Sequence, residues 1–542
     1  MQDNSNLSVL VIDPNPGLRG SLQNMLNQAS ITKIEFAVNS GTAIKQLARR
    51  NYDIILCEYD LSGGTDGQDG QQLLEDLRHH KLIGLLTIFI MLTSEGVYSK
   101  VVSAAELTPT DYILKPFTVD VLSQRITRAL DRRTAFLPIY QQIGLGNLRE
   151  AIKSCITAES ANPRYAGEFV RLRAELHVSL NDLAEAEQVY SEVLAAAKPA
   201  GWAQLGLGRT LFAQGRTEEA EKVLAILVVD NPKLMAAYDL LARCREAGGD
   251  AAGAQKILED AVIISPHVVR RLRRLGEVAL EAGDVGAAEK SFKQVVAKAK
   301  YSEFRDPEDH VNLVKTLIKK GDPGQASGVI RDMEKNLRGS PNLEVCRALS
   351  VALVHESEGQ REAAAEELGA AVGAVRSSTG LSSALKIGLA KSCLANKLDK
   401  EASEVMLAVM NDVASGVSLQ QAMGVFAKAG RQDLAEVMGA QLKQQSQNLL
   451  TVAAEKTNMG DLKGAVQTLL EALHKSPSNL QVMIALANGI LRQLGELGWD
   501  HQLAETCHRQ IETIRKLDPA HLALGPLADS YAAAKRKYGI ST

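Results

Sequence analysis

One spacing dominates most of this chain: small residues recur every 34 positions. Three columns keep this period through four segments, and they hold alanines (Ala186, Ala220, Ala254, Ala288), other small residues (Ala174, Gly208, Ala242, Gly276) and bulky residues (Tyr190, Leu224, Leu258, Phe292). This period predicts a unit of two helices, in which small residues mark a close helix crossing and bulky residues fill the seam. One such unit cannot bury its own apolar face, so we expect the units to stack into an all-α solenoid.

The repeat pattern begins near residue 134 and weakens after Lys300, but similar pairs of segments continue towards the C-terminus. Prolines that would stop the second helix recur in the early units, at Pro163, Pro232 and Pro266. We expect about ten units over residues 134–520 and a capping helix and tail over 521–542.

The first 133 residues follow a different pattern. Short apolar runs at 7–12, 34–38, 54–57, 87–92 and 112–114 alternate with helical patterns at 18–28, 42–49, 71–79 and 119–133. Five such strands separated by helices predict an α/β fold with a parallel sheet covered on both faces. Because no Pro/Gly/Ser-rich linker follows, we expect the last helix of this domain to abut the first repeat.

Composition narrows the function classes. There are 61 Lys+Arg and 64 Asp+Glu residues, for a net charge of −3, which argues against a nucleic-acid binder. The longest apolar stretch, at 82–92, is too short to span a bilayer, and no secretory signal is recognisable at the start. Six single cysteines fit a reducing compartment. We therefore expect a cytoplasmic protein with no membrane insertion.

Two resemblances follow from these patterns. The repeats resemble tetratricopeptide repeats, and the first 133 residues resemble a flavodoxin-like receiver domain of two-component systems. The second resemblance depends on acidic ends of the first and third strands, Asp13 and Glu58, on Thr93 after the fourth strand, and on the Lys115-Pro116 pair after the fifth. The whole chain is similar to bacterial response regulators that carry a tetratricopeptide repeat array.

The receiver resemblance implies a phosphoacceptor carboxylate on the third strand and two acids that hold Mg²⁺. It also implies that Thr93 and Lys115 stabilise the added charge, and that Tyr112 reports the state of the site. This sequence has Glu58 at the acceptor position and Pro14 in place of the second acid. Glutamate displaces the carboxylate from the in-line geometry of phosphoryl transfer, so we expect a pseudo-receiver that is not phosphorylated at Glu58.

Two alternatives concern the chemistry of this site. Asp60, two residues beyond Glu58, could replace it as phosphoacceptor. A weak Mg²⁺ site could remain at Asp13 and Glu58, although we expect no required cofactor and no enzymatic activity.

The tetratricopeptide repeat resemblance implies a peptide groove lined by the first helix of each unit. The positions that would face it are Arg171, Trp202, Arg209, Arg243, Arg270 and Arg273. Arginine forks and an indole suit an acidic peptide. A different pair, His501 and His508 beside Cys507, offers too few ligands for a zinc site.

We interpret the chain as a non-enzymatic signalling adaptor, with a degenerate receiver domain coupled to a protein-binding solenoid. One alternative is a phosphorylation-switched, Mg²⁺-binding response regulator that controls a partner through its repeats. Another is an assembly cofactor that uses the repeats alone. The resemblance further implies a histidine kinase or another signalling protein as receiver partner, and a homodimer as one arrangement.

Overall fold

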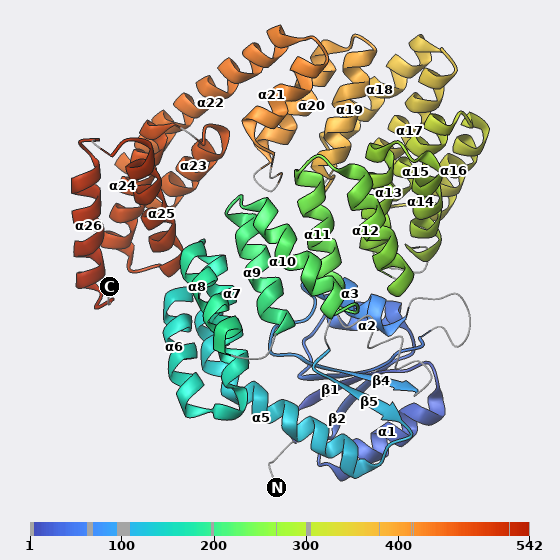
Figure 1. The fold of residues 1–542 in the computed structure, drawn as a ribbon. Coiled ribbons are helices and arrows are strands. Elements are labelled where there is room, and N and C mark those ends of the chain that lie inside the picture. Colours follow the sequence, from blue (N-terminus) through green and yellow to red (C-terminus); the bar gives the residue numbers. More distant parts are fainter. Residues whose placement is uncertain are drawn as a thin grey trace. The chain divides into compact units, whose positions relative to one another are not determined.

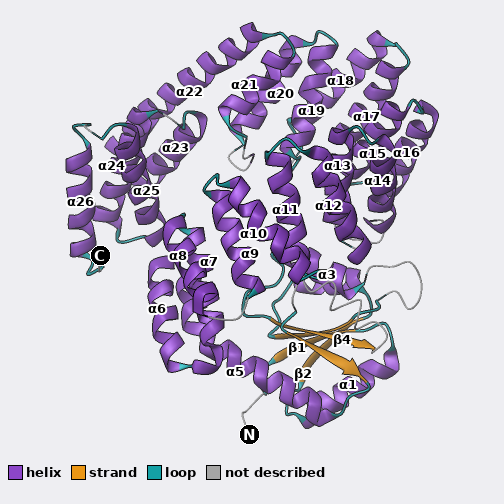
Figure 2. Ribbon diagram, viewed as in Figure 1, coloured by secondary structure: helices purple, strands orange, loops and turns teal. Residues whose placement is uncertain are grey.

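A computed structural model describes residues 5–61, 69–94, 109–196, 200–266, 268–299, 305–378, 380–412, 415, 417–477, 479–519 and 521–540. The chain divides into two compact units, residues 1–320 and 321–542, each of which is described by itself. Figure 1 labels the elements and Figure 2 shows that strands occur in the first unit.

The N-terminal region contains a five-stranded parallel sheet in the order β2-β1-β3-β4-β5. Its strands are β1 (Ser8–Ile12), β2 (Lys33–Ala37), β3 (Ile54–Glu58), β4 (Ile88–Ser94) and β5 (Asp111–Lys115). All residues of β1 are buried, as expected of a strand covered on both faces. The predicted α/β class is thus confirmed.

Helices cover both faces of this sheet. They are α1 (Pro16–Gln28), α2 (Ser40–Leu47), α3 (Gly70–His79) and α5 (Val119–Gly144). Apolar side chains of α1 and α5 join one core cluster, and those of α2 and α3 join the other. Figure 1 shows the two pairs on opposite sides of the strands. Because the strands are parallel, their carboxyl ends lie together at one edge of the sheet.

Helix α5 continues past the sheet as one 26-residue helix. Its first half packs on the sheet through Leu122 and Ile126, whereas Phe136 and Ile139 pack into the first repeat. The boundary that we expected after residue 133 falls inside this helix. The second half of α5 therefore acts as the first helix of the first repeat.

The repeats of the first unit continue as paired helices. They are α6 (Leu148–Ala161), α7 (Ala166–Ser179), α8 (Leu183–Ala196), α9 (Gly201–Ala213), α10 (Thr217–Asp230), α11 (Met235–Ala247), α12 (Ala251–Ile264), α13 (Val269–Ala282), α14 (Val285–Ala299) and α15 (Pro307–Lys320), with a short 3₁₀ turn η1 (Pro163–Tyr165) after α6.

The 34-residue columns pack against one another as the period predicts. A Cβ added to Gly208 would lie 2.9 Å from Leu224, and one added to Gly276 would lie 2.7 Å from Phe292. Each pair joins the small residue of a first helix to the bulky residue of the second helix in the same unit. The small column is therefore needed for close helix contact.

The second unit is also helical. Its helices are α16 (Pro323–Asn336), α17 (Leu343–Ser357), α18 (Arg361–Val375), α19 (Ser383–Ala395), α20 (Asp399–Asn411), α21 (Leu419–Lys428), α22 (Gln432–Asn458), α23 (Leu462–Lys475), α24 (Leu480–Leu497), α25 (His501–Leu517) and α26 (Leu524–Lys537). Helix α22 spans 27 residues and joins two expected units without a turn. In neither unit does the described chain contain a helix with the length and apolar content needed to cross a membrane.

Candidate functional site

Three charged side chains meet at the carboxyl end of the sheet. Asp13 directly follows β1, Glu58 ends β3 and Lys115 ends β5. The Lys115 ammonium forms an ion pair with Glu58, and its Nζ lies 3.4 Å from Oδ2 of Asp13. Asp13 is 1% exposed, so its carboxylate needs a compensating charge, which Lys115 supplies.

Both carboxylate oxygens of Glu58 have partners. Oε2 pairs with Lys115, and Oε1 accepts a hydrogen bond of 3.1 Å from the backbone N–H of Asp60. The Asp60 residue is exposed, beyond the end of β3. The extra methylene of glutamate thus places its carboxylate against Lys115, where the side chain bridges the ends of β3 and β5.

Asp13 is held by the turn that follows it. The backbone N–H of Asn15 donates to Oδ1 of Asp13 at 2.8 Å, and the Arg19 guanidinium donates to the Asp13 carbonyl at 2.6 Å. Pro14 lies between these groups and has no side chain for a metal. The sequence interpretation missed Asn15 and Arg19, although an Asn before a helical pattern signals an N-cap.

The remaining predicted site residues lie on strands β4 and β5. Thr93 is fully buried in β4, and its hydroxyl donates to the Ser94 carbonyl at 3.4 Å. Tyr112 in β5 is half-buried and packs beside Tyr59 on the α2–α3 face. The Lys115–Pro116 peptide bond is cis.

A magnesium ion fits this arrangement poorly. Magnesium prefers several oxygen ligands in near-octahedral geometry, whereas Asp13 and Glu58 offer only two carboxylates, and the Lys115 ammonium pairs with both of them. In the described ranges, no group of three or more His, Cys, Asp or Glu side chains could hold a metal ion.

Arg171 and Arg273, both predicted groove residues, are engaged in ion pairs. Arg171 pairs with Glu175 in the same helix at 2.8 Å. Arg273 donates to both oxygens of Asp309 at 2.6 and 2.9 Å, and this carboxylate is nearly completely buried. Burial lowers the pKa of Arg273, but the bonds to Asp309 outweigh it and raise the pKa. Arg273 is thus committed to joining α13 to α15.

The other predicted positions lie on α9, α11 and α13. Arg209 and Arg243 are exposed at equivalent positions of successive repeats. The guanidinium carbon of Arg243 lies 5.0 Å from the ring centre of Phe212. Trp202 is half-buried, with its ring 6.2 Å from that of Tyr190. Arg270 is exposed as well. We call Trp202, Arg209, Phe212 and Arg243 the α9–α11 surface.

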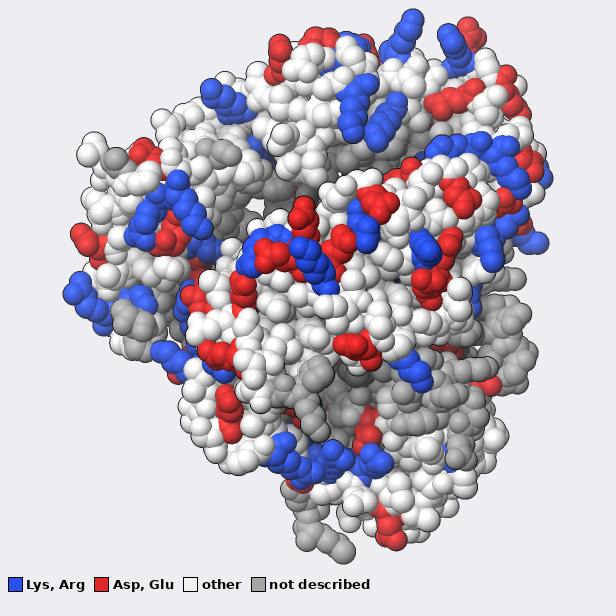
Figure 3. All heavy atoms as spheres, in the orientation of Figure 1, with Lys and Arg blue, Asp and Glu red and all other residues white. Residues whose placement is uncertain are grey.

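Acidic and basic groups neutralise one another elsewhere along these helices. Arg271, whose side chain is 1% exposed, donates to both oxygens of Asp239 at 2.9 and 3.0 Å. Arg274 pairs with Glu246 of α11 and with Glu277. Figure 3 shows basic and acidic side chains interspersed over much of the visible face. These pairs join one repeat to the next, a role that the sequence interpretation missed.

Two adjacent arginines of α5 form ion pairs, one with the residue before β3 and the other with helix α7. Arg133 pairs with Asp53 at 3.0 Å beside the sheet, while Arg132 pairs with Glu168 of α7 at 2.7 Å. Asp53 also accepts hydrogen bonds from the backbone N–H and hydroxyl of Ser8. Burial acts to raise the pKa of Asp53, but these bonds outweigh it and lower the pKa. The pairs connect the sheet directly to the first repeats.

Comparison with known proteins matches both regions. Residues 9–127 match the family model described as a response regulator receiver domain, and residues 142–201 and 177–244 match two tetratricopeptide repeat models. The first region is 26% identical over 126 residues to the chemotaxis protein CheY of Pseudomonas aeruginosa, a match that covers 23% of this chain and 98% of that protein.

Two further similarities concern the same regions. The chemotaxis protein CheY-3 of Vibrio cholerae is 24% identical over 129 residues, which are 24% of this chain and 95% of that protein. A solved tetratricopeptide repeat protein from Parabacteroides merdae is 14% identical and covers 48% of this chain and 97% of its own, with a TM-score of 0.32.

Proposed function

We propose that this chain, in which a response regulator receiver domain precedes tetratricopeptide repeats, is a signalling adaptor whose receiver works without phosphorylation. The observation that carries the proposal is the Lys115–Glu58 ion pair beside Asp13. The lysine that would meet an incoming phosphoryl group is already neutralised by a fixed carboxylate. Charge at this site is therefore set by the sequence, and no phosphodonor is needed.

Two further features support a fixed receiver. Both oxygens of Glu58 already have a partner, so an attack on a phosphodonor would have to weaken the ion pair with Lys115 or the bond from the Asp60 N–H. Pro14 removes one metal ligand, and phosphoryl transfer without a metal lacks its main electrostatic stabilisation. The adaptor needs no catalytic step of its own. Its receiver surface would instead be recognised by a signalling protein in one constant state.

Incubation with acetyl phosphate and Mg²⁺ should leave the natural chain unlabelled, as measured by intact mass spectrometry. The double variant Glu58→Asp, Pro14→Asp should become labelled, because it restores the acceptor and the missing acid. Its matched control carries the same two substitutions with Asp60→Asn, and should label equally. Labelling of the natural chain at Glu58 or Asp60 would instead support a phosphorylation-switched response regulator.

We propose that the repeats hold a protein partner at the α9–α11 surface. Arg209 and Arg243 are exposed there, one repeat apart, and in the described part of the chain neither has a carboxylate within ion-pair distance. The Phe212 ring lies beside Arg243, and Trp202 is on the same helix as Arg209. Arginine and aromatic side chains are enriched where proteins bind one another. A segment bearing carboxylates would satisfy both arginines.

Charge reversal at Arg209 and Arg243 should abolish capture of the partner from a native extract. Quantitative mass spectrometry would compare the natural chain, the double variant Arg209→Glu, Arg243→Glu, and the control Arg376→Glu. The Arg376 side chain is 72% exposed in the second unit and pairs with Glu404, so its reversal tests the same change of charge, together with the loss of one exposed ion pair, away from the α9–α11 surface. Equal recovery from all three proteins would exclude the α9–α11 surface as the partner site.

A further inference from the structure

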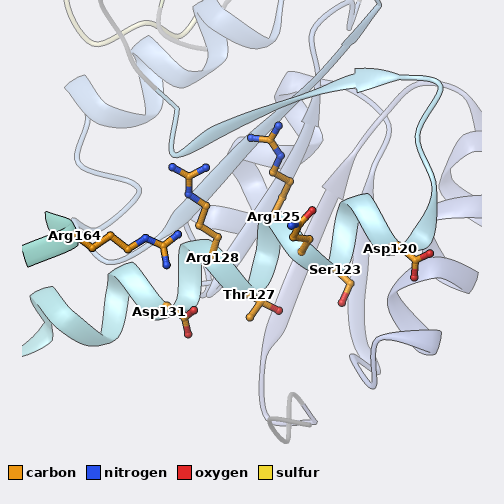
Figure 4. A pocket seen from close by; sticks show the side chains of 8 residues that line it. Asp120, Ser123, Arg125, Thr127, Arg128, Asp131 and Arg164 are labelled. Carbon is orange, nitrogen blue, oxygen red and sulfur yellow. The ribbon is translucent and has the colours of Figure 1, made fainter. Parts of the chain in front are cut away.

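A surface hollow of about 640 Å³ lies where the outer face of α5 meets η1, away from both sites described above. Three arginines line it: Arg125 and Arg128 on α5, and Arg164 on η1. Two hydroxyl groups and an amide, from Ser123, Thr127 and Gln124, add neutral hydrogen-bond donors. Figure 4 shows Arg164 reaching towards Arg128 from the neighbouring element.

The three arginines differ in what neutralises them. Arg125 donates to both oxygens of Asp111 on β5, at 3.0 and 3.1 Å. Arg128 and Arg164 are exposed, and no carboxylate of the described residues lies within ion-pair distance of either. Two guanidinium forks from separate elements are therefore available at one hollow.

Aromatic packing holds Arg164 in place. Its guanidinium carbon lies 5.4 Å from the ring centre of Tyr165, and the Tyr165 ring packs edge-on against Phe136 of α5 at 6.2 Å. Phe136 also stacks on Phe169 of α7 at 4.4 Å. The rings thus position Arg164 next to α5, and a bound anion would not have to displace an ion-paired carboxylate of the described residues from it.

We propose that Arg128 and Arg164 bind a phosphoryl group, an anion of up to two negative charges that two guanidinium groups can match. Guanidinium groups bind phosphoryl oxygens in bidentate fashion. Asp120 and Asp131 line the two ends of the same stretch of α5, which confines the anion to the part between them. The site would join α5 to the first repeats and requires neither Glu58 nor the α9–α11 surface.

Titration of the full-length chain with inorganic phosphate, at ionic strength matched with sodium chloride, tests the site. Isothermal calorimetry should detect binding that weakens about tenfold in Arg128→Gln and in Arg164→Gln, since each loses one charge-assisted contact. Asp131→Asn should tighten binding about threefold, because it removes a repelling charge. Arg376→Gln is the matched control and should bind as the natural chain does.

A parallel titration with hexaglutamate tests the class of anion. Binding of phosphate is the expected result, and binding of the peptide without binding of phosphate would overturn the proposal in favour of a carboxylate partner. The Arg209→Glu, Arg243→Glu variant should retain phosphate binding, which separates this site from the proposed partner surface. Failure of the natural chain to bind phosphate, or equal binding by the Arg128, Arg164 and Arg376 variants, would also overturn the proposal.

Discussion

Replacement of Lys115 by methionine is expected to destabilise the receiver domain by about 3–5 kcal/mol, because it removes one partner from a buried ion pair. Asp13 is 1% exposed, and the Glu58 side chain is 14% exposed. Without the ammonium, two carboxylates at the ends of neighbouring strands would repel each other with little water to separate them. A methionine of similar length fills the space but supplies no charge.

Hydrogen–deuterium exchange of peptides from β1 and β3 would measure this loss. Fluorescence is unsuitable, because both tryptophans, Trp202 and Trp499, lie in the repeats. The double variant Glu58→Gln, Lys115→Met should recover part of the stability, since it removes one of the two uncompensated charges. Protection in Lys115→Met equal to that of the natural chain would contradict the charge arrangement described here.

The receiver site could be predicted because its residues stand at strand ends. Apolar runs end at Asp13, Glu58 and Lys115, and the carboxyl ends of parallel strands meet at one edge. Sequence reasoning did not find Asn15, although an Asn before a helical pattern is an N-cap signal, and it did not find Arg19, whose guanidinium donates to the backbone carbonyl of Asp13 and not to a side chain that a motif would show.

Helix continuity was harder to predict. The expected boundary at residue 133 lies inside α5, because Phe136 and Ile139 continue the apolar pattern on a new face that packs on repeats instead of the sheet. Pro138 lies within this helix without ending it. Helix α22 is likewise a single helix of 27 residues, longer than the helices of the early repeats. Periodicity identifies helices, but the packing partner decides where each one ends.

The ion-pair partners of the α13 arginines were also not predicted from the sequence, because they lie in other repeats. Register placed Arg273 among the groove residues, whereas the structure pairs it with Asp309, 36 positions ahead. Arg271 pairs with Asp239, 32 positions back. Both separations are close to the 34-residue period, because stacked repeats bring equivalent positions together. A search for opposite charges about one period apart would have found these pairs and reduced the set of groove candidates.

Replacement of Asp239 by alanine is expected to destabilise the first repeats by about 3–5 kcal/mol, because it leaves the Arg271 guanidinium buried without this carboxylate. Arginine cannot relieve the strain by losing its proton, since it stays charged at any accessible pH. Removal of the other partner, Arg271, should lower the stability of these repeats much less. In Arg271→Met, the Asp239 side chain, which is 44% exposed, can be solvated by water, so we expect a loss of about 1 kcal/mol or less.

Urea unfolding followed by Trp202 fluorescence would measure this asymmetry, with Trp499→Phe as a common background so that one tryptophan reports. Trp202 lies in α9, one repeat before Asp239, and urea does not screen the ion pairs as guanidinium chloride would. The control is Glu175→Ala, which breaks the exposed Arg171–Glu175 pair and should cost about 0.5 kcal/mol or less. If Asp239→Ala and Arg271→Met lower the midpoint equally, the burial of Arg271 does not govern the stability of these repeats.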